Sequence, residues 1–289
     1  MQMAINRLQN RVLLVLAAAA MGGAALLSIS HGAYFEPYFG GMAPVLATAM
    51  IVGLGIFSFQ LVHFHGLFEV YPSGAPFRRA PRFLAITTLF FPPVILADLW
   101  IGFPQDINVL LPWSLLFYPT MGLVAEMSFH VLPLALLLVP LKLFEVRGAE
   151  KLVWPAILLV SAIEPGFQIR SALTSQSYSL IDIFVALHIF FFSLVQLYAF
   201  RWHGFVLMLA IRLYYYLGWH IVWGSLRLPL LFCATSCGDR GVCVQSCTDY
   251  FYLLPRATDF MININDASRY GAILGPIVYA AIRFGRSGL

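Results

Sequence analysis

The stretch that decides the fold of this chain is IDIFVALHIFFFSLVQLYAFRWHGFVLMLAIRLYYYLGWHIVWG, residues 181–224. It belongs to two apolar runs, 179–200 and 204–225, which are separated only by the short turn Arg201-Trp-His-Gly204. A helix needs about 20 mostly apolar residues to cross the hydrocarbon core of a bilayer. Both runs are long enough, so we expect two successive transmembrane helices here.

Runs of the same kind occur along the rest of the chain, and together they predict an all-α integral membrane protein with a bundle of about eight transmembrane helices. The run at 109–140 is longer than one simple span and contains several prolines, so we expect a kink or a short half-helix before its main span. The further runs lie at approximately 12–29, 43–67, 83–103, 109–140, 152–169 and 270–285.

The composition agrees with a lipid-covered surface. Hydrophobic residues make up 61% of the 289 residues, charged residues 10%, and the mean hydropathy is +0.84. A soluble domain has about a quarter charged residues, so the lipid bilayer is the first partner that we expect. We expect a single membrane domain over 1–289, divided into N-terminal helices (1–109), a core (110–225), an extracytoplasmic cysteine-rich loop (226–269) and a last helix (270–289).

Most basic residues gather in short clusters between the apolar runs. Such clusters set membrane orientation, and we do not interpret the net charge of +4 as nucleic-acid binding. With eight spans the clusters fall on one side of the membrane, and the positive-inside rule then places both termini of this inner- or plasma-membrane protein in the cytoplasm. The clusters are Arg7 and Arg11; Arg78, Arg79 and Arg82; Lys142, Arg147 and Lys151; Arg201; and Arg283 and Arg286.

The first run has two interpretations. Arg7 and Arg11 before the alanine-rich run at 12–28 also fit a secretory signal peptide. We favour an uncleaved first helix, because the run is long and no clean Ala-x-Ala spacing ends it.

All four cysteines fall in one stretch, which the predicted topology places outside the cytoplasm. Disulfides persist there, so we expect a small loop that is crosslinked by two disulfides. Three pairings of the four cysteines are possible. The alternative is a zinc or iron–sulfur site, although the Cys-x-x-Cys spacing that typifies such sites is absent. The cysteines are Cys233, Cys237, Cys243 and Cys247.

Ionisable residues inside the apolar runs are the candidates for function, because such groups are costly in a bilayer unless they face a partner or a wet cavity. The fourth run contains Glu126 and His130, and the fifth contains Glu164 and Gln168. In both pairs the residues are four apart, so they share one helix face.

The two runs quoted first add more polar groups. His188 lies in the first of them, and Arg212, Tyr216 and His220 lie in the second at a spacing of four. These three share one stripe of a helix. Four successive helices thus offer polar side chains, which would form one cluster if they face inward.

The residue types in this cluster suit three kinds of role. A buried glutamate could activate water as a general base, and histidines could orient that water or stabilise an oxyanion. The carboxylates and imidazoles could instead bind a divalent metal such as zinc or iron. The structural alternative is that these groups only connect helices, with Arg212 paired to Glu126 or Glu164.

The polar motifs resemble those of the CAAX-protease and bacteriocin-processing family, also called type II CAAX endopeptidases. The family signature is Glu-Glu-x-x-x-Arg on one helix, Phe-x-x-x-His on a next and His-x-x-x-Asn on a later one. Here 125–130 resembles the first motif, with Ala125 for the first glutamate and His130 for the arginine. His220-Ile-Val-Trp-Gly224 resembles the last motif, with glycine for asparagine.

The second motif can be placed in two ways. The segment 159–168 lies where the motif is usual, with Glu164 and Gln168 for its Phe and His, whereas Phe184-x-x-x-His188 matches the letters one span later. The resemblance covers roughly 110–225. It implies a multi-helix membrane core and a glutamate-dependent intramembrane endopeptidase, which acts on membrane-embedded or prenylated peptides. Since the family's usual water-activating glutamate is Ala125 here, Glu126 or Glu164 would have to replace it, or only the fold has been kept.

We therefore consider three hypotheses for the function. The first is an intramembrane peptidase in which Glu126 or Glu164 activates water and His188 and His220 position it. The second is a non-catalytic scaffold, or a carrier that uses the carboxylates as a proton relay. The third is a metal-dependent membrane oxidase.

Overall fold

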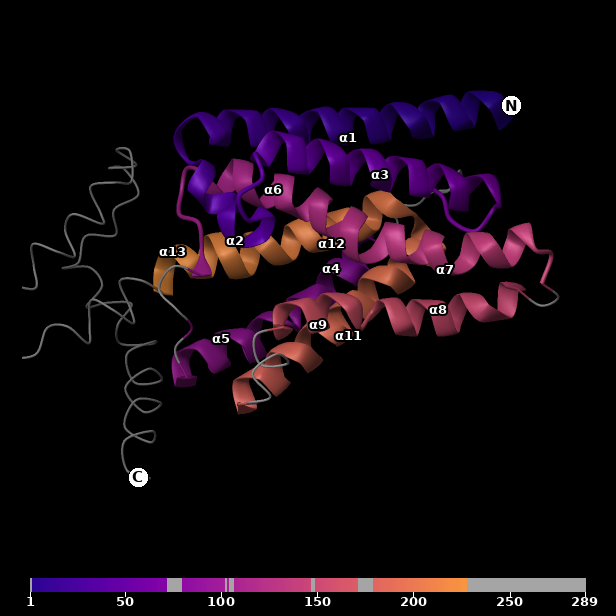
Figure 1. Ribbon diagram of the computed structural model, residues 1–289. Coiled ribbons are helices and arrows are strands. Elements are labelled where there is room, and N and C mark those ends of the chain that lie inside the picture. Colours follow the sequence, from indigo (N-terminus) through magenta and orange to yellow (C-terminus); the bar gives the residue numbers. More distant parts are fainter. Residues whose placement is uncertain are drawn as a thin grey trace, which may run out of the picture.

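The computed structural model describes residues 2–71, 80–101, 103, 107–146, 149–170 and 179–227, which form helices and no strands (Figure 1). Within these residues six helical segments are long and apolar enough to cross a membrane. The prediction of an all-helical fold with several segments long and apolar enough to span a membrane is therefore confirmed for the described residues. The six segments are Leu8–Ile29, Pro44–Phe64, Ala80–Trp100, Ser114–Leu143, Leu180–His203 and Phe205–Arg227.

The expected count of about eight spans is not confirmed. The run at 152–169 forms two shorter helices, α8 (Val153–Val160) and α9 (Ile163–Gln168), with a turn between them. Pro165 has no N–H to donate to the carbonyl of residue 161, so a continuous helix is disfavoured and a new one begins. The expected run at 270–285 lies outside the described residues.

The fourth span is one long helical segment that contains a π-helical turn. It consists of α6 (Ser114–Ala125), the π-helical η4 (Glu126–Val131) and α7 (Leu132–Leu143). We expected a kink or a short half-helix at its start, and of these two the half-helix is not found in 107–113, where a turn over 111–113 precedes Ser114. Pro133 follows η4 directly, and the wider hydrogen-bonded ring of a π-helix is one way to accommodate its missing N–H.

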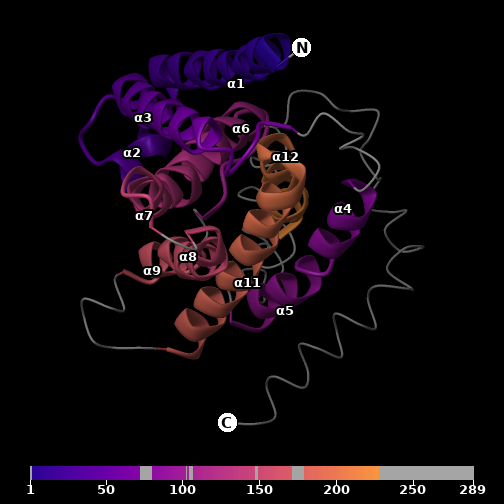
Figure 2. The same cartoon turned by 90° about the vertical axis from the view of Figure 1, so that its right-hand side faces the viewer.

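Helices α11 (Leu180–His203) and α12 (Phe205–Tyr216) lie in the middle of the bundle (Figure 2). On one side of them are α7, α8 and α9, and on the other are α4 (Ala80–Thr88) and α5 (Phe91–Ile101). The chain continues from α12 through the π-helical η6 (Leu217–Trp223) into α13 (Gly224–Arg227). Side chains on α11 and α12 can therefore meet groups from both halves of the molecule.

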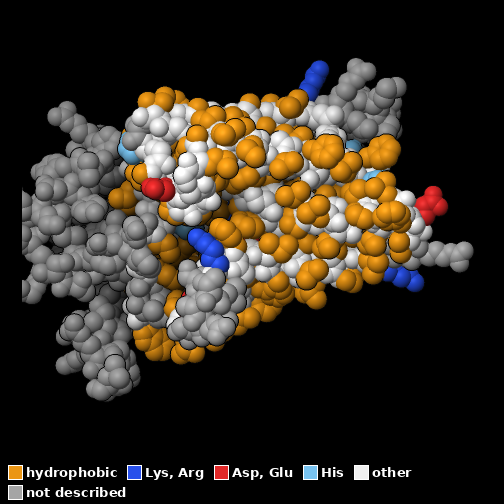
Figure 3. Space-filling model, viewed as in Figure 1, with side chains coloured by type: hydrophobic (Ala, Val, Ile, Leu, Met, Phe, Trp, Pro, Cys, Tyr) orange, Lys and Arg blue, Asp and Glu red, His pale blue; other side chains and the backbone are white. Residues whose placement is uncertain are grey.

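Helices α1 (Gln2–Ser30) and α3 (Pro44–Phe64) cover one side of the bundle, with η1 (Gly32–Phe35) and α2 (Glu36–Phe39) in the link between them (Figure 1). Helix α3 packs closely on η4, because a Cβ at Gly55 would lie 2.5 Å from the Met127 side chain. Small residues allow such close approach between membrane helices. The face in Figure 3 is mostly hydrophobic with few charged side chains, as a lipid-facing surface requires.

The chain before residue 72 anchors the start of α12. The N–H groups of Phe205 and Val206 donate to the carbonyls of Glu69 and Val70, each at 3.0 Å. These bonds satisfy helix N–H groups that have no partner inside the helix. Gly204 makes the approach possible: its φ is +86°, and a Cβ there would lie 2.6 Å from the Val70 carbonyl oxygen.

Candidate functional site

The centre of the bundle holds a buried polar network around Arg212 of α12. Glu126 of η4 and Glu164 of α9 are its acidic members, and His130 and Gln196 join them from η4 and α11. The side chains of both glutamates and of Arg212 are at most 6% exposed. The structure thus brings together Glu126, Glu164 and Arg212. The structural alternative had predicted that Arg212 pairs with Glu126 or Glu164.

The guanidinium of Arg212 connects α12 to three other helical elements, η4, α9 and α11. Its Nε donates to Glu126 Oε1 at 2.5 Å, and its two Nη atoms donate to the two carboxylate oxygens of Glu164 at 2.8 and 2.7 Å. The two parallel bonds to Glu164 have the fork geometry that makes arginine–carboxylate pairs strong. Further bonds reach Gln196 Oε1 at 3.2 Å and the Tyr216 hydroxyl at 3.3 Å.

His130 lies between the two carboxylates. Its Nδ1 is 2.5 Å from Glu126 Oε2, and its Nε2 is 3.9 Å from Glu164 Oε2 without a hydrogen-bond partner among the described residues. Two ionised carboxylates exceed the single positive charge of Arg212, and unbalanced charge is costly at this depth. A proton on His130 or on one carboxylate would balance the network.

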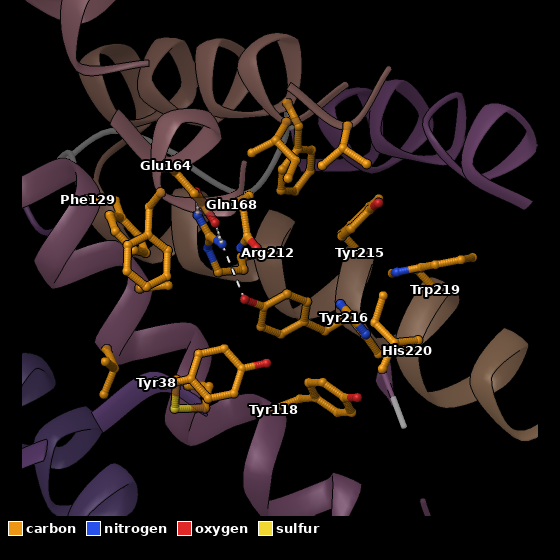
Figure 4. A pocket seen from close by; sticks show the side chains of 18 of the residues that line it. Tyr38, Tyr118, Phe129, Glu164, Gln168, Arg212, Tyr215, Tyr216, Trp219 and His220 are labelled. Atoms are coloured by element: carbon orange, nitrogen blue, oxygen red, sulfur yellow. Dashed lines mark hydrogen bonds and ion pairs between the residues drawn. The ribbon is translucent and has the colours of Figure 1, made fainter. Parts of the chain in front are cut away.

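A cavity of about 400 Å³ lies next to this network, walled mainly by aromatic and aliphatic side chains. Figure 4 shows Glu164, Gln168 and Arg212 gathered at one part of it and His220 at another. Glu126 and His130 do not line it, but they contact Arg212 and Glu164, which do. Of the seven predicted site residues, those lining the cavity are Glu164, Gln168, His188, Arg212 and His220.

Both cavity imidazoles are held by hydrogen bonds. His188 Nε2 lies 2.9 Å from the Tyr215 hydroxyl. His220 Nδ1 lies 2.7 Å from Asn108 Oδ1, and its ring stacks on Tyr118 at 4.7 Å between centroids. Such bonds fix the orientation of each ring.

One tyrosine reaches the cavity from outside the long helices. Tyr38 of α2 lines it beside Tyr118, as Figure 4 shows. Burial raises the pKa of the Tyr38 hydroxyl, an effect that the positive charge of Arg170 partly opposes. This hydroxyl therefore stays protonated at neutral pH and can donate a hydrogen bond into the cavity.

Several members of the site were not among the residues predicted from the sequence. Gln196 hydrogen-bonds Glu126 and accepts from Arg212, and the Ser193 hydroxyl donates to Glu164 Oε2 at 3.4 Å. Both are polar residues inside an apolar run, which was the available signal. Asn108 had no such signal, because it lies at the edge of an apolar run.

A second buried ion pair does not itself line the cavity, although Phe103, which hydrogen-bonds both of its members, does. This pair corrects one prediction. We expected Arg227 in the loop after the seventh run, but it lies in α13, fully buried, and Asp98 of α5 is equally buried. Arg227 donates from Nε and Nη2 to the Asp98 carboxylate at 2.7 and 2.8 Å, and Trp223 Nε1 donates to the same group at 2.7 Å. This cluster ties α5 to the end of the α12 segment.

Both π-helical turns carry candidate residues. Glu126 and His130 lie in η4, and His220 lies in η6. Single π-helical turns inside α-helices are rare and occur frequently at functional sites. Their positions therefore support the view that this region is more than packing.

The described part of the chain contains no set of side chains arranged as the predicted metal site would require. Within it, no group of three or more His, Cys, Asp or Glu side chains is placed to hold one metal ion. The four cysteines, with their predicted disulfides or metal site, lie outside the described residues. Compared with models of protein families, with curated proteins and with solved structures, the chain has no match in any of the three.

Proposed function

We propose that this chain is an intramembrane peptidase of the glutamate/histidine type. The observation that carries the proposal is one cavity inside a membrane bundle, lined by Glu164, His188 and His220 from three separate helical elements. Carboxylate and imidazole are the two groups that hydrolysis of an amide requires for proton transfer and orientation. The cavity also agrees with the resemblance of residues 110–225 to the CAAX-protease family.

In this proposal Glu164 takes a proton from water as the water oxygen attacks the peptide carbonyl. His188 or His220 donates a hydrogen bond to the oxyanion that forms. The proton then passes from Glu164 to the leaving amine, and the products are a carboxylate and an amine. Arg212 holds the Glu164 carboxylate in place, and its fork must loosen for the carboxylate to act as a base.

The substrate class follows from the cavity walls. Aromatic and aliphatic side chains dominate them, and a volume of about 400 Å³ is within the range of small-molecule sites. A membrane-embedded or prenylated peptide would present an apolar chain to these walls and its amide to the polar part. A cytoplasmic position for both termini follows from the basic clusters with the eight predicted spans, of which six are found among the described residues.

The test is cleavage of membrane-embedded peptides in proteoliposomes, read as new amino termini by mass spectrometry. We expect Glu164→Gln to lower the rate about 100-fold or more, since a positioned proton-transfer group contributes that much. Glu150→Gln is the matched control, because the Glu150 side chain is 84% exposed and remote from the cavity. Full cleavage by both Glu126→Gln and Glu164→Gln would end the proposal.

A non-catalytic scaffold or proton-coupled carrier is the second candidate, favoured by the direct pairing of Arg212 with both glutamates. A pH-sensitive dye inside proteoliposomes separates the two candidates. Proton uptake that is lost in Glu126→Gln, in protein that cleaves no peptide, would support the carrier.

A further inference from the structure

His220 is held by a residue that lies far from it in the sequence. Asn108 precedes α6 and is 8% exposed, and its Oδ1 lies 2.7 Å from His220 Nδ1. Tyr118 fixes both parts of this contact. Its hydroxyl accepts a hydrogen bond from the N–H of Val109 at 2.9 Å. Its ring stacks on the His220 imidazole, with an angle of 23° between the two planes.

The chain leaves room for Asn108 at Gly224. A Cβ at position 224 would lie 3.0 to 3.1 Å from the Cγ, Cβ and Nδ2 atoms of Asn108, which is tighter than nearly all real contacts. Gly224 is also the position at which the sequence departs from the motif His-x-x-x-Asn. An amide side chain is thus present at this place in space, but it comes from a different element.

The contact determines which nitrogen of the imidazole carries the proton. A neutral imidazole has one N–H donor and one acceptor nitrogen, whereas an amide oxygen only accepts. Asn108 Oδ1 therefore selects the tautomer with the proton on Nδ1. His220 lines the cavity and Asn108 does not, so the lone pair of Nε2 is left for the cavity.

We infer that Asn108 is the positioning residue of His220: it selects the Nδ1–H tautomer and presents Nε2 to the cavity as a hydrogen-bond acceptor. The consequence for catalysis rests on the proposed function, but the tautomer does not. In catalysis Nε2 would then accept a hydrogen bond from the attacking water and orient it while Glu164 takes the other proton, and the oxyanion would be left to His188.

The experiment is nitrogen-15 solid-state NMR of the full chain, labelled at histidine and reconstituted in lipid bilayers at pH 8. The chain has seven histidines, and His220→Gln identifies the signals of His220 by their loss. We expect a protonated-type shift at Nδ1 and an unprotonated-type shift at Nε2. In Asn108→Leu these shifts should exchange or average, and in Asn108→Asp, which keeps an accepting oxygen, Nδ1 should remain protonated.

Ser114→Ala is the matched control, because Ser114 is a fully buried polar residue near Asn108 in the chain whose hydroxyl has no hydrogen-bond partner among the described residues. Its spectrum should equal that of the wild type. A proton on Nε2 in the wild type, as a rotated amide would require, or unchanged shifts in Asn108→Leu would overturn the inference.

Peptide cleavage in the same variants separates this inference from the proposed function. With active protein, Asn108→Leu should lower the rate about 100-fold and Asn108→Asp should restore much of it. If the wild type shows the expected tautomer and cleaves no peptide, the positioning role stands and the hydrolytic proposal fails.

Discussion

Replacement of Arg212 by methionine should destabilise the bundle more than any exposed substitution. The side chain is 1% exposed and makes five hydrogen bonds, three of them to the carboxylates of Glu126 and Glu164. Removal of one member of a buried ion pair costs about 3–5 kcal/mol, because the charge left behind stays buried without compensation. The folded-to-unfolded ratio should therefore fall roughly 100- to 4,000-fold, at 1.4 kcal/mol for each factor of ten.

The assay is reversible unfolding in mixed micelles by a denaturing detergent, followed by tryptophan fluorescence. Arg170→Met is the control, because Arg170 is exposed and its contacts in the described part of the chain are a hydrogen bond to the Phe167 carbonyl and a cation–π contact with the Phe167 ring at 4.3 Å. Arg170→Met should lower the free energy of unfolding by less than about 1 kcal/mol, which is the usual limit for an exposed ion pair. The stability of Arg212→Lys should lie between those of Arg212→Met and Arg170→Met, since lysine keeps the positive charge but cannot form the two parallel hydrogen bonds to Glu164.

A triple variant tests the physical reason. Glu126→Met, Glu164→Met and Arg212→Met together replace all three charged side chains with apolar ones of similar volume, which for buried clusters is often neutral or stabilising. The triple variant should therefore be more stable than Arg212→Met alone. The reasoning is refuted if Arg212→Met loses less than about 1 kcal/mol, or if the triple variant is no more stable than the single one.

Two other sites give predictions of the same kind. Asp98→Leu removes the carboxylate that Arg227 binds and should lower the free energy of unfolding by about 3–5 kcal/mol in the same assay. The double variant Asp98→Leu with Arg227→Met should recover most of this free energy. Equal stability of the single and double variants would contradict the prediction. Gly204→Ala should cost at least about 1–3 kcal/mol, because alanine is strained at a φ of +86° and would contact the Val70 carbonyl. Gly53→Ala is its control, since no neighbouring atom lies within 4 Å of a Cβ there. An alanine inside a helix should be neutral or stabilising, so a thermal unfolding shift of equal size in both variants would refute the argument.

The sequence predicted the membrane fold because apolar runs of spanning length leave few alternatives. It also predicted the Glu126–His130 pair, since a spacing of four places two side chains together on a helix. The pairing of Arg212 with either glutamate was one of its alternatives, and the structure has both pairs at once.

The remaining features depend on contacts that a local pattern does not contain. Asp98 and Arg227 are 129 residues apart, and Asn108 and His220 are 112 apart. Neither pair has a periodic signal, because each is created by the packing of separate helices. The π-helical turns were missed for a related reason: apolar periodicity indicates a helix but not a local change in its hydrogen-bond ring.

The π-helical turn η4 also determines the rotational register of the fourth span. Each residue of an α-helix advances the side-chain direction by about 100°. A π-helical turn takes up one more residue than an α-helical turn, so if 126–131 were α-helical without loss of a residue, α7 would be rotated against α6 by about that angle. The α7 face that now enters the core, which includes Leu134 and Leu138, would turn towards lipid. In a chain whose exposed and buried residues are both apolar, this extra residue fixes which side of α7 packs inward.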